Sequence, residues 1–152
     1  MSEFTYRKAE PTDFPLISET KKRSLLEEGD WDEKTLGAIT ENFVNTVKRG
    51  ALTAYLAFCG SEFAGLGAIL ILREEAALSE FYVLPKYRNM GVMHGLINSL
   101  IKEARKHGCE RALLIVKEEH RAHWQARGFR DLFEENDDGE TFLSQRMEML
   151  LN

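Results

Sequence analysis

The amino-acid sequence predicts a mixed α/β fold, an α+β arrangement in which helices pack on a sheet that has antiparallel and parallel parts. Segments with apolar residues at helical spacing alternate with short apolar runs, and turn residues separate them. The predicted element order is β-α-α-β-β-β-α-β-α-β-β. The chain has 152 residues, 43% of them hydrophobic, which is enough for a core within a single domain, residues 1–152.

The N-terminal elements follow from alternation, caps and turn residues. Asp13 or Thr12 can cap the first helix, and Gly50 ends the second. Cys59-Gly60-Ser61-Glu62 is a hairpin signal between two strands. The predicted ranges are Phe4–Lys8 (strand), Pro15–Glu28 and Glu33–Arg49 (helices), and Leu52–Phe58 and Phe63–Arg73 (strands).

The C-terminal elements begin with a third strand of this sheet and a long helix. The helix has apolar residues at every third or fourth position and ends at Gly108. The polar turn 135–140 separates the last two strands. The predicted ranges are Ala77–Leu84 (strand), Val92–Lys106 (helix), Ala112–Val116 (strand), Glu119–Arg127 (helix), and Asp131–Glu134 and Phe142–Leu150 (strands).

Composition excludes several classes of protein. No stretch is long and apolar enough to span a bilayer, and the first residues lack a secretory signal. The net charge of −5 argues against nonspecific nucleic-acid binding. Cys59 and Cys109 are too few for a disulfide framework or a zinc cluster. We therefore expect a cytoplasmic protein that binds neither nucleic acid nor membrane.

The segment 83–92, Val-Leu-Pro-Lys-Tyr-Arg-Asn-Met-Gly-Val, carries the strongest functional signal. It joins a predicted strand to a predicted helix, so the first N–H groups of that helix have no partner within it. Together with the positive end of the helix dipole they form an anion site. Gly91 permits a tight turn and a close approach of the backbone to a ligand. The segment therefore predicts a site for a phosphate-bearing ligand.

This segment resembles the signature loop of the GNAT superfamily, the acyl-CoA-dependent N-acetyltransferases. Further likeness lies in Leu113–Val116, in Trp124-Gln125-Ala126-Arg127-Gly128-Phe129, and in the methionine-rich end Gln145–Leu150. The resemblance implies that acetyl-CoA is the cosubstrate and that backbone amides of the loop bind its pyrophosphate. It also places the pantetheine arm alongside the strand that ends at Val83. The implied cofactor-binding residues are Phe81, Val83, Arg88, Asn89, Met90, Gly91, Val92, Met93 and His94.

Three of these positions depart from the family pattern or have a second interpretation. Met93 stands where the family has Gly or Ala, so its side chain must turn away from the diphosphate. Phe81 and Val83 can equally be core residues, since the proposed contact uses only backbone. Arg88 can also pair with a phosphate as a planar fork. A backbone N–H near Val83 would face the developing oxyanion.

Glu80 is the candidate general base. An alkylamine arrives as ammonium at neutral pH, so a base or a water relay must remove a proton. Glu80 lies three residues before Val83 in an otherwise apolar strand, where a carboxylate is costly unless it faces a cleft or a partner. The alternatives are that it pairs with a nearby Lys or Arg or points to solvent.

Trp124 stands where the family has a tyrosine that protonates the departing thiolate. An indole N–H is no acid near neutral pH, so we expect Trp124 to pack over the acyl-pantetheine end. His120, predicted to share a helical face with Trp124, could supply the proton, or could be a surface histidine. Thiolate departure could also need no acid. His120 and His123 without a supporting cluster are poor evidence for a metal site, and we expect none.

Two functions therefore remain. The chain is predicted to be an N-acetyltransferase that moves an acetyl group from acetyl-CoA to a primary amine of a small molecule or peptide. The alternative is a non-catalytic acyl-CoA-binding or sensing module. The resemblance places the acceptor near Leu16–Arg49 and Glu134–Phe142, with Trp31, Phe43 and Phe133 as lining or core residues. A homodimer through an edge strand is a further suggestion of the resemblance.

Overall fold

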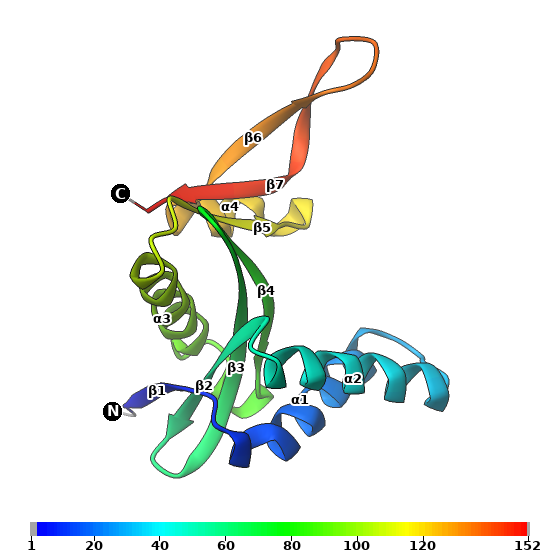
Figure 1. The fold of residues 1–152 in the computed structure, drawn as a ribbon, viewed down its shortest axis with the longest axis vertical. Coiled ribbons are helices and arrows are strands. Elements are labelled where there is room, and N and C mark those ends of the chain that lie inside the picture. Colours follow the sequence, from blue (N-terminus) through cyan, green and yellow to red (C-terminus); the bar gives the residue numbers. More distant parts are fainter. Residues whose placement is uncertain (1–2, 152) are drawn as a thin grey trace. The chain divides into compact units, whose positions relative to one another are not determined.

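The computed structural model describes residues 3–151 and has the predicted order of helices and strands (Figure 1). The strands follow the order β1-β2-β3-β4-β5-β7-β6 in one mixed sheet. The chain divides into two compact units, residues 1–70 with 79–100, and residues 71–78 with 101–152. Met1, Ser2 and Asn152 lie outside the described residues. That residues 1–152 form a single domain stays a prediction.

The elements agree with the sequence prediction to within a few residues, and three single-turn 3-10 helices (η) are added. Their bounds are β1 Phe4–Lys8, η1 Pro11–Asp13, α1 Phe14–Glu28, α2 Glu33–Lys48, β2 Leu52–Cys59, β3 Glu62–Leu72, β4 Glu75–Val83, η2 Pro85–Tyr87, α3 Val92–Lys106, β5 Arg111–Ile115, η3 Glu118–His120, α4 Arg121–Ala126, β6 Arg130–Glu135 and β7 Thr141–Leu150.

The first two helices differ in how they begin, and the side-chain cap predicted at Asp13 is not formed. Asp32 caps α2 by accepting a hydrogen bond from Thr35 N–H at 2.8 Å. Asp13 precedes α1, but its carboxylate accepts two hydrogen bonds from Arg7 instead of capping the helix. The Arg7 guanidinium lowers the pKa of Asp13. This ion pair holds the start of α1 against β1.

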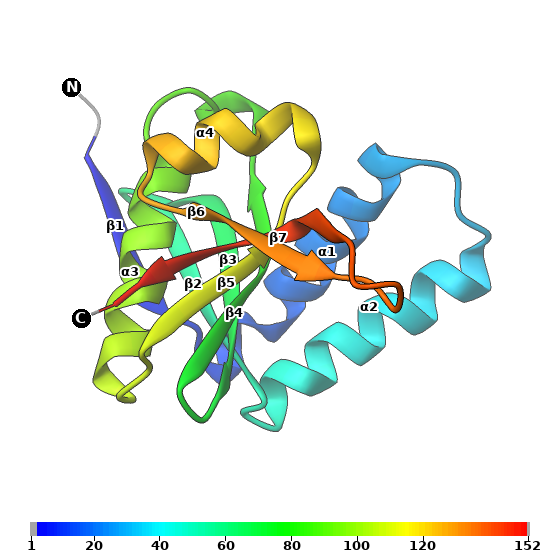
Figure 2. The ribbon, with the colours of Figure 1, turned by 90° about the horizontal axis from the view of Figure 1, so that it is seen from above.

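In the first unit, helices cover both faces of the β1-β2-β3 ladder (Figures 1 and 2). Helices α1 and α2 pack on one face, where Ile17, Phe43 and Leu56 are buried. The α3 residues Val92 and Leu96 pack on the other face with exposures of 1% and 0%. Burial of each such side chain stabilises the fold by about 1.5–3 kcal/mol. Because Val92 is the first residue of α3, its burial holds the start of this helix against the sheet.

In the second unit, β4 pairs in parallel with β5 over Glu75–Ala77, and β7 pairs with β5 and β6 in antiparallel fashion. Glu148 on β7 is 3% exposed and accepts hydrogen bonds from Arg111 and Arg130. Burial raises the pKa of Glu148, and the two guanidiniums lower it by more, so the net shift is downward. None of the helices in residues 3–151 is both long and apolar enough to cross a bilayer.

Candidate functional site

The loop between β4 and α3 makes the tight turn predicted at Gly91 and leads directly into α3. After the single turn of η2, two residues adopt positive φ, Asn89 at 65° and Gly91 at 87°. The Gly91 carbonyl accepts a hydrogen bond from Gly95 N–H at 3.1 Å, which marks the first turn of α3. A Cβ added at Gly91 would meet no atom within 4 Å. Open space therefore lies beside the backbone where the N–H groups of the helix begin.

Tyr87 fastens this loop to the start of β3. Its side chain is buried, and its hydroxyl donates to Glu62 Oε1 at 2.6 Å, where Lys86 Nζ also donates at 3.0 Å. The Tyr87 hydroxyl and then the Lys86 ammonium lower the pKa of Glu62. The Tyr87 ring also packs edge-to-face on Phe4 of β1 at 5.7 Å. These contacts hold the loop in place before α3 begins.

Arg88 fastens the other side of the loop. Its Nε donates to the Val83 carbonyl at 2.8 Å, and its Nη2 donates to Glu27 of α1 at 3.1 Å. Sequence reasoning offered Arg88 as a fork for phosphate and the Val83 backbone as a partner of pantetheine. In the structure the Arg88 fork holds a carboxylate and a carbonyl of the protein. The Val83 carbonyl is thereby occupied.

The end of β4 presents different residues to its two faces. Val83 packs with the α3 core, and the Phe81 ring lies 3.2 Å from where a Cβ on Gly67 would be. Their side chains thus belong to the core, as one interpretation of the sequence held. Glu80 and Tyr82 instead face α1. This alternation is the two-residue period of a strand, and it separates core packing from the polar residues.

Glu80 pairs with Lys21 of α1. The Lys21 ammonium donates to both carboxylate oxygens at 3.0 Å, and it lies 5.2 Å from the centroid of the Phe43 ring. The side chains of Lys21 and Glu80 are 12% and 29% exposed. Pairing with a lysine or arginine was one of the alternatives for Glu80, and its role as a base stays a prediction.

Sequence reasoning did not find Lys21, which is 59 positions away from Glu80. One signal was present. Lys21 lies four residues after Ile17 and four before Leu25, both buried, and so falls on the face of α1 that packs toward the sheet. A lysine on such a face needs an anionic partner. In the same way, the Glu80 carboxylate lies in an apolar strand and needs a cationic partner.

Tyr82 is a second residue that sequence reasoning missed. Its hydroxyl is buried and makes no hydrogen bond of ordinary geometry within residues 3–151. Burial, and after it the nearby Glu27 carboxylate, raise the pKa of this phenol. In turn the Tyr82 hydroxyl is the main influence that lowers the pKa of Glu27. The two groups are therefore neighbours, but their mutual geometry falls short of a regular hydrogen bond.

His120 and Trp124 lie in the second unit. His120 closes η3 and precedes α4, whereas the sequence placed it inside a helix with Trp124. Its side chain is 58% exposed and lies 3.8 Å from the Glu119 carboxylate. Trp124 packs edge-to-face on Phe129 and on His123, each at 5.5 Å. The roles predicted for His120 and Trp124 in transfer stay predictions.

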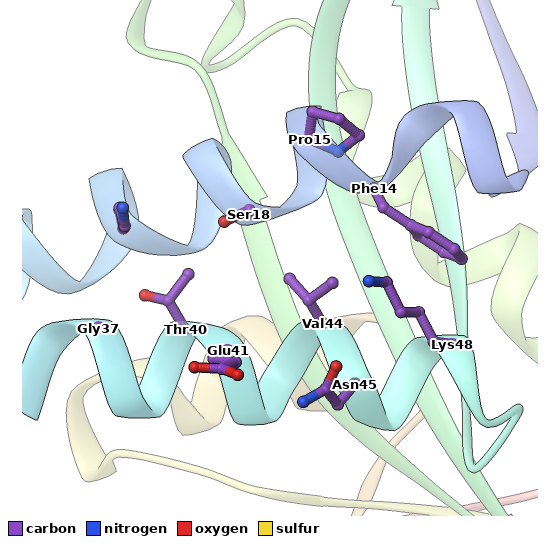
Figure 3. Close-up of a pocket in the computed structure, with 10 residues that line it drawn as sticks. Phe14, Pro15, Ser18, Gly37, Thr40, Glu41, Val44, Asn45 and Lys48 are labelled. Atoms are coloured by element: carbon purple, nitrogen blue, oxygen red, sulfur yellow. The ribbon is translucent and has the colours of Figure 1, made fainter.

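Grooves lie at both of the segments predicted to meet the acceptor. A groove of about 580 Å³ runs between α1 and α2 (Figure 3), with Phe14, Thr40 and Lys48 among its lining residues. A groove of about 410 Å³ in the second unit is lined by residues of β5, β6 and β7 that include Glu134 and Phe142.

The three aromatic residues suggested for the acceptor differ in exposure. Phe43 is 6% exposed and belongs to the core beneath α1 and α2. Trp31 is exposed, and its indole N–H donates to the Leu25 carbonyl at 2.9 Å. Phe133 on β6 is 66% exposed. Whether any of them meets an acceptor stays a prediction.

Within residues 3–151, no three His, Cys, Asp or Glu side chains are grouped closely enough to hold a metal ion. Cys59 is half-buried and Cys109 is buried, and both are free thiols. Burial raises the pKa of the Cys109 thiol, so it is a poor nucleophile at neutral pH.

Solved structures with the same fold span nearly the whole chain. The PaiA N-acetyltransferase from Thermoplasma acidophilum, in complex with coenzyme A, has 20% identity and a TM-score of 0.72, covering 97% of this chain and 99% of its own. A predicted acetyltransferase from Clostridium acetobutylicum with acetyl-CoA has 22% identity and a TM-score of 0.71, covering 86% and 92%. The ribosomal-protein-S18-alanine N-acetyltransferase from Escherichia coli has 20% identity and a TM-score of 0.70, covering 99% and 95%.

A search of curated proteins found no match. The family model of the acetyltransferase (GNAT) family matches residues 13–135, well over half of the chain. This match confirms the resemblance that the 83–92 segment carried. The chain is therefore a member of the GNAT family of acetyltransferases.

Proposed function

We propose that this GNAT-family chain transfers an acetyl group from acetyl-CoA to a primary amine of a small molecule or peptide. The observation that carries the proposal is the turn at Gly91, where a positive φ and open space adjoin the first N–H groups of α3. Such a turn suits the diphosphate of coenzyme A. The coenzyme A and acetyl-CoA bound in two structures of the same fold support this choice of cosubstrate.

In this proposal the backbone from Arg88 to His94 holds the pyrophosphate. Tyr87 and Arg88 act by fixing the loop to β3, β4 and α1, because their side chains are already engaged with protein groups. The Met93 side chain is half-buried and packs against the α3 core, which leaves its backbone amide as the donor. Pantetheine would lie along the end of β4, with a backbone N–H near Val83 toward the thioester oxygen.

The transfer itself would proceed by nucleophilic attack. Glu80 takes a proton from the acceptor ammonium, and the neutral amine attacks the thioester carbonyl carbon. The carbon–sulfur bond then breaks and the thiolate leaves with the electron pair. The nitrogen passes its second surplus proton to the departing thiolate or to solvent, which gives the neutral amide and the free thiol. A thiol pKa near ~8.5 makes the thiolate a fair leaving group without an acid. His120 remains the candidate if a proton donor is needed, and Trp124 a packing residue.

The test combines free-thiol release with mass spectrometry of products. Purified protein with acetyl-CoA and a panel of primary amines should yield acetylated products, and Glu80→Gln should reduce kcat by roughly 10²-fold or more. Glu110→Gln is the matched control, since Glu110 is an exposed glutamate in the bend before β5. Equal turnover in the wild type and Glu80→Gln would remove Glu80 from the mechanism.

One observation favours the non-catalytic alternative. The Glu80 carboxylate forms an ion pair with Lys21, and Trp124 stands where the family has a tyrosine. The candidate base is therefore engaged by the protein itself, and the usual acid is missing. A sensing module would bind acetyl-CoA, and its melting temperature would rise with ligand concentration. It would acetylate no member of the panel, and one good acceptor would end this alternative.

A further inference from the structure

Glu80 and Phe43 both lie beside the ammonium group of Lys21. The Glu80 carboxylate offers both oxygens at 3.0 Å, and the Phe43 ring centroid lies 5.2 Å from the same ammonium. A carboxylate with an aromatic face is a favourable setting for a primary ammonium. Glu80 and Phe43 come from β4 and α2, and Lys21 reaches them from α1.

The proposed reaction needs an ammonium at this same carboxylate. If Glu80 accepts a proton directly from the acceptor, the acceptor nitrogen must reach hydrogen-bond distance of Glu80. Lys21 Nζ already occupies that position. We propose that Lys21 is an internal competitor of the acceptor, and that Glu80 with Phe43 forms the acceptor-ammonium subsite that Lys21 vacates on binding. This inference rests on the proposed function.

Lys21 is suited to leave because its charge ends a flexible four-carbon stem. The side chains of Lys21 and Glu80 are 12% and 29% exposed, so water reaches part of the pair and lowers the cost of opening it. If the pair is closed nine-tenths of the time, the apparent affinity for an external ammonium is reduced roughly tenfold. Lys21 would then set how strongly an amine must bind to be a substrate.

The same geometry indicates the acceptor class. The site holds an unsubstituted ammonium on an unbranched alkyl chain, since that is the chemistry of the Lys21 side chain. We therefore expect unhindered primary alkylamines to enter, including lysine-like side chains. Amines that carry a carboxylate next to the nitrogen would meet the negative charge of Glu80 and be disfavoured.

Chemical rescue tests the subsite without any acetyl transfer. Lys21→Ala removes the atoms of n-propylammonium, so we expect that ion to raise the melting temperature of Lys21→Ala by about 3 °C at ten times its Kd. Neutral n-propanol and sodium chloride at equal ionic strength should not do so. The response should be absent from Lys21→Ala/Glu80→Gln, from Lys21→Met, whose apolar stem fills the space, and from the exposed neighbour variant Lys22→Ala.

An equal response of the wild type and Lys21→Ala, or a response that survives Glu80→Gln, would overturn the subsite. Lys21→Ser serves in the same comparison if Lys21→Ala does not fold. With acetyl-CoA present, Lys21→Ala should acetylate n-propylamine with a KM about tenfold below that of the wild type. An unchanged or higher KM would refute the competitor role. Thermal rescue without any acetylated product would uphold the cation site and reject the proposed transferase function.

Discussion

Replacing Gly91 by alanine separates backbone strain from loss of ligand binding. Gly91 has φ of 87°, a region in which an L-residue is strained, and a Cβ there would meet no protein atom within 4 Å. The substitution therefore adds no packing clash in the free protein. Its Cβ would project into the space where we place the diphosphate.

The expected magnitudes follow from these two facts. The positive φ should destabilise Gly91→Ala by about 1–2 kcal/mol, which lowers the melting temperature by about 2–8 °C for a chain of this size. If the loop keeps its shape, this strain is present with and without ligand and cancels in the binding free energy. Contact of the new Cβ with the diphosphate does not cancel, and we expect the Kd for coenzyme A to rise about tenfold or more.

Gly50→Ala is the matched control. Gly50 has φ of 77° and equally open surroundings, but it follows α2 and not the candidate loop. Both variants should therefore lose similar stability in thermal melts, while calorimetry with coenzyme A should find weaker binding only for Gly91→Ala. If Gly91→Ala binds coenzyme A as tightly as Gly50→Ala does, the backbone around residue 91 is not the diphosphate site.

Further substitutions test contacts that stabilise the loop and each unit by itself. Tyr87→Phe loses a 2.6 Å hydrogen bond to β3 and should cost about 1 kcal/mol in urea unfolding. Tyr82→Phe removes a buried hydroxyl that has no regular hydrogen bond in the described residues, so its unfolding free energy should change by less than about 0.5 kcal/mol. Gly95→Ala would place a Cβ against the ring and hydroxyl of Tyr6 on β1; the half-buried Tyr6 side chain must then move, and we expect a cost of about 1–3 kcal/mol in thermal melts. The pKa of Glu148 is lowered in the folded state, so its stabilisation is present above about pH 4.3 and is lost as the pH falls through the lower folded pKa. Melts from pH 7 to pH 3 should then show the advantage of the wild type over Glu148→Gln shrinking, and a constant difference would contradict that linkage.

The sequence predicted the elements well because local signals and burial agree along this chain. The α3 helix illustrates this agreement, since Val92, Leu96 and Leu100 recur at helical spacing and all are buried. Gly50 and Gly91, chosen from the sequence as a helix stop and a tight turn, both adopt positive φ. These features depend on residues close in the chain, which a single sequence displays directly.

Side-chain pairing across elements was not predictable in the same way. The sequence shows that Arg88 carries a planar guanidinium with several donors, but it does not show which groups those donors meet. The partners are Glu27 on α1 and the Val83 carbonyl, and contact with Glu27 depends on where α1 packs. Tyr82 looked like an ordinary strand residue, and the position of its buried hydroxyl beside Glu27 depends on where α1 packs on β4. Single-sequence reasoning assigns residues to faces, but it does not choose between several carboxylates that could meet one guanidinium.

The Glu80–Lys21 pair could have been predicted by combining the needs of two charged residues. A carboxylate in an apolar strand requires a cation or a cleft, and a lysine on the buried face of an amphipathic helix requires an anion. The sequence contains both demands, in Glu80 and in Lys21, and the structure satisfies each with the other at 3.0 Å. Because a transferase must bring an ammonium to its base, a lysine that already sits there either supports the fold only or stands in for the substrate. The stand-in interpretation requires the Glu80 site, once emptied, to accept an external ammonium, whereas a lysine with a purely structural role requires no such acceptance.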